Sequence, residues 1–190
     1  ARAKGDIDVV ALGGHLLLAG VASSAGDVTL QAWDGSILGS ARSFDRGIVH
    51  VAGQDLSLEA GNDVDAQQAP GTRNIGSLLA ALDIDADTLQ ARTHTALRSV
   101  IAVQDADDLT IAGDGLVVDR QGQFVVRAGA DLTVQTRLRV AADEGGAVLL
   151  EAVSGTLTVA DVIDVAEGVL SLIAGEDVVQ QAGSTILNPK

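Results

Sequence analysis

A repeat of about 22 residues runs from one end of the sequence to the other, and it limits the possible folds more than any single residue does. Eight repeats start near residues 5, 26, 47, 76, 99, 122, 146 and 168. The positions two and four residues after each start are apolar in all eight: Ile7, Val28, Val49, Leu78, Ile101, Phe124, Val148 and Leu170, and then Val9, Leu30, Val51, Ala80, Val103, Val126, Leu150 and Leu172. A step of two residues is the period of a β-strand. Because so short a repeat cannot bury its own apolar face, the repeats must stack on one another.

Each repeat also carries a second short strand pattern, in which aliphatic residues alternate with Thr or Ser. It is clearest in residues 55–58, 108–111 and 131–134. Thr is favoured on the pleated surface of a strand, and Gly or Asp stands where the chain has to turn. Two or three short strands in each repeat describe one coil of a parallel β-helix. We therefore predict an all-β, single-domain parallel β-helix (a solenoid) over residues 1–190, with about eight coils of 21–24 residues.

The composition agrees with a thin, evenly filled rod and disfavours several classes of protein. Only 2% of the residues are aromatic, so the core must consist of Val, Leu, Ile and Ala. The net charge of −14 disfavours binding to nucleic acid. The sequence has no Cys to form disulfides and no apolar run long enough to cross a bilayer, so we expect no membrane insertion.

The first residues of the sequence contain no Met and no basic region followed by an apolar one. The repeat pattern also runs to both ends. We therefore expect an internal segment of a longer repeat protein, in which adjacent β-helical coils of the parent protein are its nearest partners.

Two of the repeats carry a family resemblance: residues 52–64 (AGQDLSLEAGNDV) and residues 168–178 (GVLSLIAGEDV) look like the repeats of filamentous haemagglutinin. The resemblance covers most of the chain. It implies a right-handed β-helical shaft of a large exoprotein that Gram-negative bacteria export by two-partner secretion, through an outer-membrane transporter. It also implies a secreted or cell-surface location and a role in adhesion, biofilm formation, virulence or toxin delivery. The Asn-Pro-Asn motifs of the family's secretion domain do not occur in this sequence, so the resemblance is to the shaft.

From these observations we expect a non-catalytic structural shaft segment that acts as a rigid spacer in a secreted or surface-exposed adhesin, with no cofactor. A receptor or glycan on a host cell or on a bacterial surface would be its further partner. The alternative is a carbohydrate-binding or polysaccharide-cleaving β-helix that uses an acidic strand face.

Three aspartates are the candidates for such an acidic face. Asp83, Asp85 and Asp87 alternate along one expected strand, so their side chains would point the same way. Enzymes that cleave glycosidic bonds use paired carboxylates. A basic group would have to lie nearby, and Arg92 and Arg98 are the closest in sequence. An exposed acidic face without catalysis is the simpler interpretation.

A column of carboxylates is the candidate metal site. Asp85, Asp108 and Asp131 share one offset in three consecutive repeats, so stacking would place them about 5 Å apart. Such a column is a candidate for binding calcium, which prefers oxygen ligands. We favour a turn role and expect no bound metal, because Asp at a corner accepts hydrogen bonds from backbone N–H groups at the start of the next strand.

An insertion near residues 68–75 is the candidate partner-binding loop. The repeat that starts at Gly47 is longer than the others, and the extra residues include Gln68, Pro70, Arg73 and Asn74. Insertions in solenoids form loops on one face, and loops carry binding sites more often than the shaft does. A tolerated insertion without a partner is the alternative.

Overall fold

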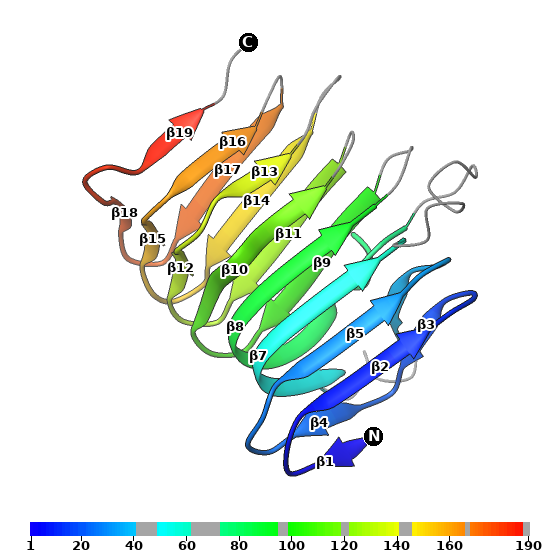
Figure 1. Ribbon diagram of the computed structural model, residues 1–190. Coiled ribbons are helices and arrows are strands. Elements are labelled where there is room, and N and C mark those ends of the chain that lie inside the picture. Colours follow the sequence, from blue (N-terminus) through cyan, green and yellow to red (C-terminus); the bar gives the residue numbers. More distant parts are fainter. Residues whose placement is uncertain are drawn as a thin grey trace.

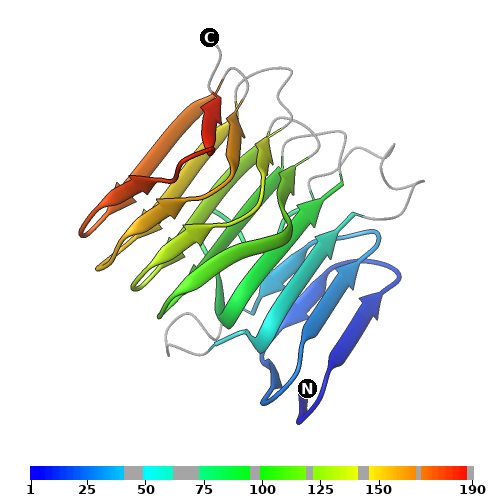
Figure 2. The ribbon, with the colours of Figure 1, turned by 60° about the vertical axis from the view of Figure 1, so that its left-hand side comes forward.

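The computed structural model is a stack of about seven turns of parallel β-strands, and it confirms the predicted β-solenoid. It describes residues 1–40, 49–61, 73–94, 99–118, 122–140, 146–165 and 168–187. These residues contain no helix, and therefore none of the length and apolar character needed to cross a membrane. Strands β1 (Arg2–Ala3) and β19 (Thr185–Leu187) lie at opposite ends of the stack (Figures 1 and 2).

Strands of successive turns pair in parallel and form three ladders. Ladder A contains β1, β4 (Val21–Ser23), the starts of β7 (Val51–Ala60) and β8 (Leu82–Thr93), β9 (Ser99–Asp105), β11 (Gly122–Ala128), β14 (Ala147–Ala152) and β17 (Val169–Ala174). Ladder B contains the starts of β2 (Ile7–Ala11), β5 (Val28–Ala32) and β10 (Leu109–Val118), the middle of β7 and β8, β12 (Leu132–Val134), β15 (Leu157–Val159) and β18 (Val178–Gln180). Ladder C contains the ends of β2, β5, β7, β8 and β10, followed by β13 (Leu138–Val140), β16 (Val162–Val165) and β19. Strands β3 (Leu16–Leu18) and β6 (Ile37–Gly39) form a separate pair.

The outline of the solenoid changes at β10. Strands β2, β5, β7 and β8 run through ladders B and C without a break, whereas the register of β10 shifts between Ile111 and Leu116. Beyond β10, ladders B and C are built from separate strands, such as β12 and β13. Figure 1 shows β7, β8 and β10 as long continuous strands, and β12 and β13 as separate ones.

Stacked aliphatic side chains form the core between the ladders. Val103, Val126 and Leu150 are aligned in successive strands of ladder A, and all three are fully buried. Phe124, on the same ladder, is the largest fully buried side chain of the described residues. Each fully buried side chain of this kind contributes about 1.5–3 kcal/mol relative to its exposed state. The predicted aliphatic stack is therefore confirmed for these turns.

The predicted apolar columns are not continuous. Ile7, Val9, Val28 and Leu30 lie in ladder B, whereas Val51 and the members from Ile101 onward lie in ladder A. Ala80 pairs locally with Ser77. Val49 and Leu78 are 39% and 56% exposed. Val28 is aligned instead with Leu56, and Leu56 with Leu89.

Leu78 is displaced because ladder A contains extra chain. Ile75 pairs with Ile101 and Leu82 with Val103, so residues 76–81 stand where the next turn has a single residue. Ser77 and Ala80 form an antiparallel bridge within this extra segment and turn the residues between them outward. The sequence indicates that this repeat is long, but it does not locate these extra residues, because the chain returns to the same alternation after them.

Candidate functional site

Aspartates at the corner before ladder B link successive turns. The backbone N–H of Asp27 donates a hydrogen bond to Asp6 Oδ1 (3.1 Å), and the N–H of Asp55 donates to Asp27 Oδ1 (3.3 Å). In a later turn the N–H of Asp131 donates to Asp108 Oδ1 (2.9 Å). The predicted turn role of such aspartates is therefore confirmed, since each carboxylate accepts from the start of the next strand.

The predicted column of Asp85, Asp108 and Asp131 is assembled only in part. Asp108 and Asp131 are neighbours, but Asp85 is paired with Ala52 in ladder A and is exposed. The inserted residues 76–81 shift the repeat that contains Asp85, which is why an equal offset from the repeat start misplaces Asp85. Within the described ranges, no group of three or more His, Cys, Asp or Glu side chains could hold a metal ion.

Asp83, Asp85 and Asp87 alternate with buried residues along β8, so their side chains lie outside the core. Asp83 accepts a hydrogen bond from Gln104 Nε2 on the next strand of ladder A. Its Oδ2 atom also lies 3.4 Å from Nδ1 of the fully buried His50. Interactions with neighbouring turns therefore hold this carboxylate in place.

Asp83 also lines a groove of about 260 Å³ on the outer surface of ladder A, together with Arg127. The Nε atom of Arg127 lies 2.7 Å from Oε2 of Glu151 in the next turn. Arg92 lines a different groove, on ladders B and C, and Arg98 lies outside the described residues. Among the described residues that line this groove with Asp83, the basic one is therefore Arg127, which the sequence did not indicate.

Two of the four residues of the predicted partner-binding loop, Gln68 and Pro70, lie outside the described residues. Arg73 is buried, and its Nη2 atom donates to Asp34 Oδ1 (3.2 Å). Asn74 Oδ1 accepts a hydrogen bond from a backbone N–H of the next turn (2.9 Å). Both residues contact the solenoid itself, and binding of a partner by this loop stays a prediction.

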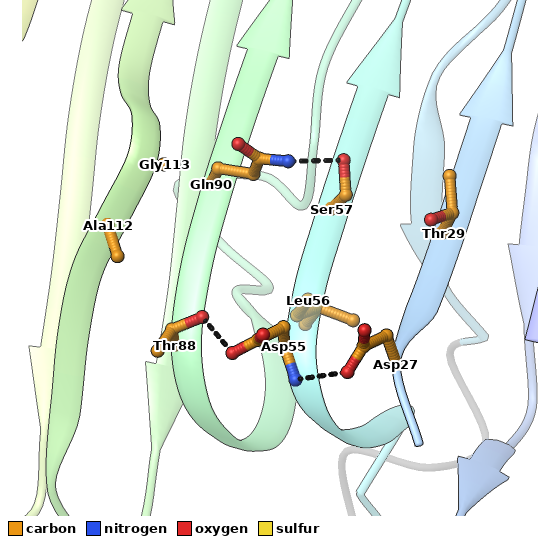
Figure 3. Close-up of a pocket in the computed structure, with 9 residues that line it drawn as sticks. All are labelled: Asp27, Thr29, Asp55, Leu56, Ser57, Thr88, Gln90, Ala112 and Gly113. Atoms are coloured by element: carbon orange, nitrogen blue, oxygen red, sulfur yellow. Dashed lines mark hydrogen bonds between the residues drawn. The ribbon is translucent and has the colours of Figure 1, made fainter. Parts of the chain in front are cut away.

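A polar groove of about 380 Å³ lies on the outer surface of ladder B (Figure 3). Its floor consists of two rows of side chains from successive turns: Asp27, Asp55 and Thr88 in one row, and Thr29, Ser57 and Gln90 in the other. Leu56, Ala112 and Gly113 complete its lining. The floor residues of the second row alternate with buried residues of the same strands, so the pattern that builds the core also builds the floor.

Hydrogen bonds between turns hold the side chains of the floor. Thr88 Oγ1 donates to Asp55 Oδ1 (2.7 Å), and Gln90 Nε2 donates to Ser57 Oγ (3.1 Å). Figure 3 shows both contacts across the strands, together with the contact from the Asp55 N–H to Asp27. These side chains are therefore ordered before any ligand arrives, which reduces the entropy lost on binding.

A bulge in β10 forms the wall of the groove. Residues 112–115 stand opposite the single residue Gln90, because Ile111 pairs with Leu89 and Leu116 with Ala91. Gln90 Oε1 accepts a hydrogen bond from a backbone N–H of the bulge, that of Asp114 (3.0 Å).

Gly113 allows the bulge to approach the floor closely. Its φ is +59°, and a Cβ atom at this position would lie 2.2 Å from Gln90 Oε1. A side chain here would therefore strain the backbone and displace Gln90. The backbone can adopt this geometry because residue 113 is a glycine.

A smaller groove of about 120 Å³ adjoins the first one along the bulge. It shares Ser57 and Gln90 with the polar groove, and Glu59 and Arg92 lie on its ladder C side. Glu59 Oε1 lies 2.7 Å from Nε2 of His94.

The sequence did not indicate any of the floor residues of the polar groove as a site. A signal was present in residues 112–115 (Ala-Gly-Asp-Gly), whose two glycines indicate an irregular strand.

A buried aspartate ends strand β9 of ladder A. Asp105 is paired with Ile84, and it is 8% exposed. Its Oδ2 accepts a hydrogen bond from the N–H of Ala86 (3.0 Å), and its Oδ1 accepts one from the N–H of Asp107 (3.0 Å). Burial raises the pKa of the Asp105 carboxyl above its ordinary value, although these two hydrogen bonds oppose the rise.

In comparisons with known proteins, no family model, no curated protein and no solved structure matches the chain. The evidence for the fold is the strand pairing, and the candidate functional sites lie on the surface of the solenoid.

Proposed function

We propose that this chain is a non-catalytic structural shaft segment of a secreted or surface-exposed bacterial adhesin, and that it acts as a rigid spacer in cell adhesion or biofilm formation. The observation that carries the proposal is the continuous pairing of successive turns, from β1 with β4 at one end to β16 with β19 at the other. The resemblance of the repeats to filamentous haemagglutinin supports the cellular location and the export through an outer-membrane transporter.

The pairing supports a mechanical role because a bend would have to open one ladder. Each turn is fixed to the next by backbone hydrogen bonds and by aligned aliphatic side chains such as Val126 and Leu150. The corner aspartates add further bonds between turns. About seven turns at the spacing of paired strands give a rod roughly 30 Å long. Adjacent coils of a parent protein would extend this rod and hold a receptor-binding or glycan-binding tip away from the cell.

Stiffness is tested by measuring the distance between two spin labels. Ser24 and Glu176 are exposed and lie near opposite ends of the stack, and the sequence contains no Cys that would compete for labelling. We expect the Ser24→Cys/Glu176→Cys double variant to give a single narrow distance distribution by pulsed electron paramagnetic resonance. The same sample in urea provides the broad reference. A broad or bimodal distribution under native conditions would contradict the spacer proposal.

The non-catalytic part of the proposal needs its own assay. The chain is incubated with neutral and with acidic polysaccharides, and the release of new reducing ends is measured. We expect none above the level of an unfolded control. Release that disappears on Asp83→Asn would instead support a polysaccharide-cleaving enzyme.

A further inference from the structure

The polar groove beside the β10 bulge has features that a spacer does not need. Its two rows of side chains repeat at the strand spacing of about 4.8 Å, which is close to the length of one sugar ring in an extended oligosaccharide. One row of the floor carries two carboxylates and a hydroxyl group, and the other carries two hydroxyl groups and an amide. We propose that this groove binds a neutral oligosaccharide, a function beyond that of the shaft.

The chemistry of the floor fits sugar hydroxyl groups. A sugar hydroxyl both donates and accepts hydrogen bonds, and the groove offers both partners: Asp27 and Asp55 accept, whereas Thr29 and Ser57 can do either. Gln90 is already tied to Ser57 and to the bulge, so its amide is fixed in orientation. Ligand sites commonly combine such fixed polar groups with a concave shape.

The charge of the groove selects among carbohydrates. The nine described residues that line it include two carboxylates and no Lys, Arg or His. The chain as a whole carries a net charge of −14. Sulfated and uronic acid polymers would therefore be repelled, and a neutral chain would not.

The backbone around the groove argues against a peptide ligand that would add a strand to the sheet. Below the groove, β7 pairs with β5 on one side and with β8 on the other, and β8 pairs with β10. No strand edge is open among these described strands, so the ligand must be recognised by side chains. The bulge closes one side of the floor and gives the ligand a wall to rest against.

The test uses the whole chain and a panel of neutral hexasaccharides (cellohexaose, maltohexaose, laminarihexaose and mannohexaose), with a sulfated hexasaccharide as the anionic probe. Binding is followed by calorimetry and by amide chemical shifts. The Ser57→Ala/Thr88→Val variant removes two hydroxyls from the floor. Thr158→Val is the matched control, because Thr158 occupies the same register row as Thr88 through Thr110 and Thr133 but does not line the groove.

We expect at least one neutral hexasaccharide to bind, with an affinity about tenfold lower for the double variant and unchanged for Thr158→Val. Shifted amides should lie in β7, β8 and residues 112–115. The proposal is overturned by absence of binding at ligand concentrations on the order of 10 mM, by tighter binding of the sulfated probe, or by an equal loss in the control. None of these results would alter the spin-label distances, so failure of this proposal can be distinguished from failure of the spacer proposal.

Discussion

Leu150 tests whether the stacked aliphatic columns carry the stability of the solenoid. Its side chain is fully buried, and it is aligned between Val126 and Leu172 in ladder A. Replacing it with Ala removes buried carbon atoms and leaves a cavity that the two neighbouring turns can close only in part, because both are fixed by their own ladders. We expect the free energy of unfolding to fall by about 3 kcal/mol.

The matched control is the preceding residue of the same strand. Leu149 is half-buried on the outer surface and is aligned with Val125 and Ser171, so Leu149→Ala should lower the free energy of unfolding by less than about 1 kcal/mol. Urea unfolding followed by far-ultraviolet circular dichroism measures both changes. With a slope of about 2–3 kcal/mol per molar urea, Leu150→Ala should lower the midpoint by roughly 1 M.

A second probe shows how far the destabilisation by Leu150→Ala extends along the stack. Trp33, the single Trp, follows β5 near the other end of the stack, so its fluorescence reports on turns remote from Leu150. In a solenoid each turn contacts mainly its neighbours, and distant turns can unfold separately. The Trp33 transition should therefore shift less than the circular dichroism transition. Equal effects of Leu150→Ala and Leu149→Ala would refute the assignment of inward and outward positions.

Three further predictions concern the corners. Gly155→Ala should lower the free energy of unfolding by about 1–3 kcal/mol, because a Cβ atom there would lie 2.1 Å from Asp131 Oδ1. The control in the same denaturation assay is Gly5→Ala, because a Cβ atom at residue 5 would have no heavy atom within 4 Å. Burial raises the pKa of the Asp105 carboxyl, so its contribution to stability is present at low pH and is lost as the pH rises through the folded pKa. Between about pH 3 and pH 7, the free energy of unfolding should therefore decline in wild type relative to Asp105→Asn. Parallel pH profiles of the two proteins would contradict this. Asp108→Asn retains an oxygen that can accept the turn hydrogen bond, so it should change the free energy of unfolding by less than about 1 kcal/mol. Calcium should leave the melting temperature of both proteins unchanged. A calcium-dependent rise in the melting temperature of wild type that the variant lacks would instead support the metal site.

The sequence predicts the fold where the repeat is regular. Ile101, Phe124 and Val148 are aligned as expected, because no residues are inserted between the marker positions of those turns. The prediction is wrong at Leu78, which lies in the extra chain of ladder A, and at Val49, which is exposed just before β7 begins. Alternation specifies which side of a strand a residue faces, but it does not reveal how many residues separate two paired strands.

The candidate sites, like the fold, could be predicted only in part from the sequence. The turn role of Asp108 and Asp131 follows from the chemistry of an aspartate at a corner, and a hydrogen bond of 2.9 Å bears it out. The floor of the polar groove could not be predicted in this way. Ser57 and Gln90 are ordinary polar residues of a strand surface, and they line a groove only because the bulge lies beside them.

Irregular positions are where a solenoid can acquire function without losing its core. A regular stack exposes flat rows of side chains, and a flat row cannot enclose a ligand. The bulge at residues 112–115 adds chain on the outer surface while Ile111 and Leu116 keep their buried positions. It therefore creates a wall without disturbing the aliphatic stack. The inserted residues 76–81 follow the same rule, since Ile75 and Leu82 on either side of them remain fully buried. On this reasoning, deleting the bulge should abolish sugar binding and leave the rod intact.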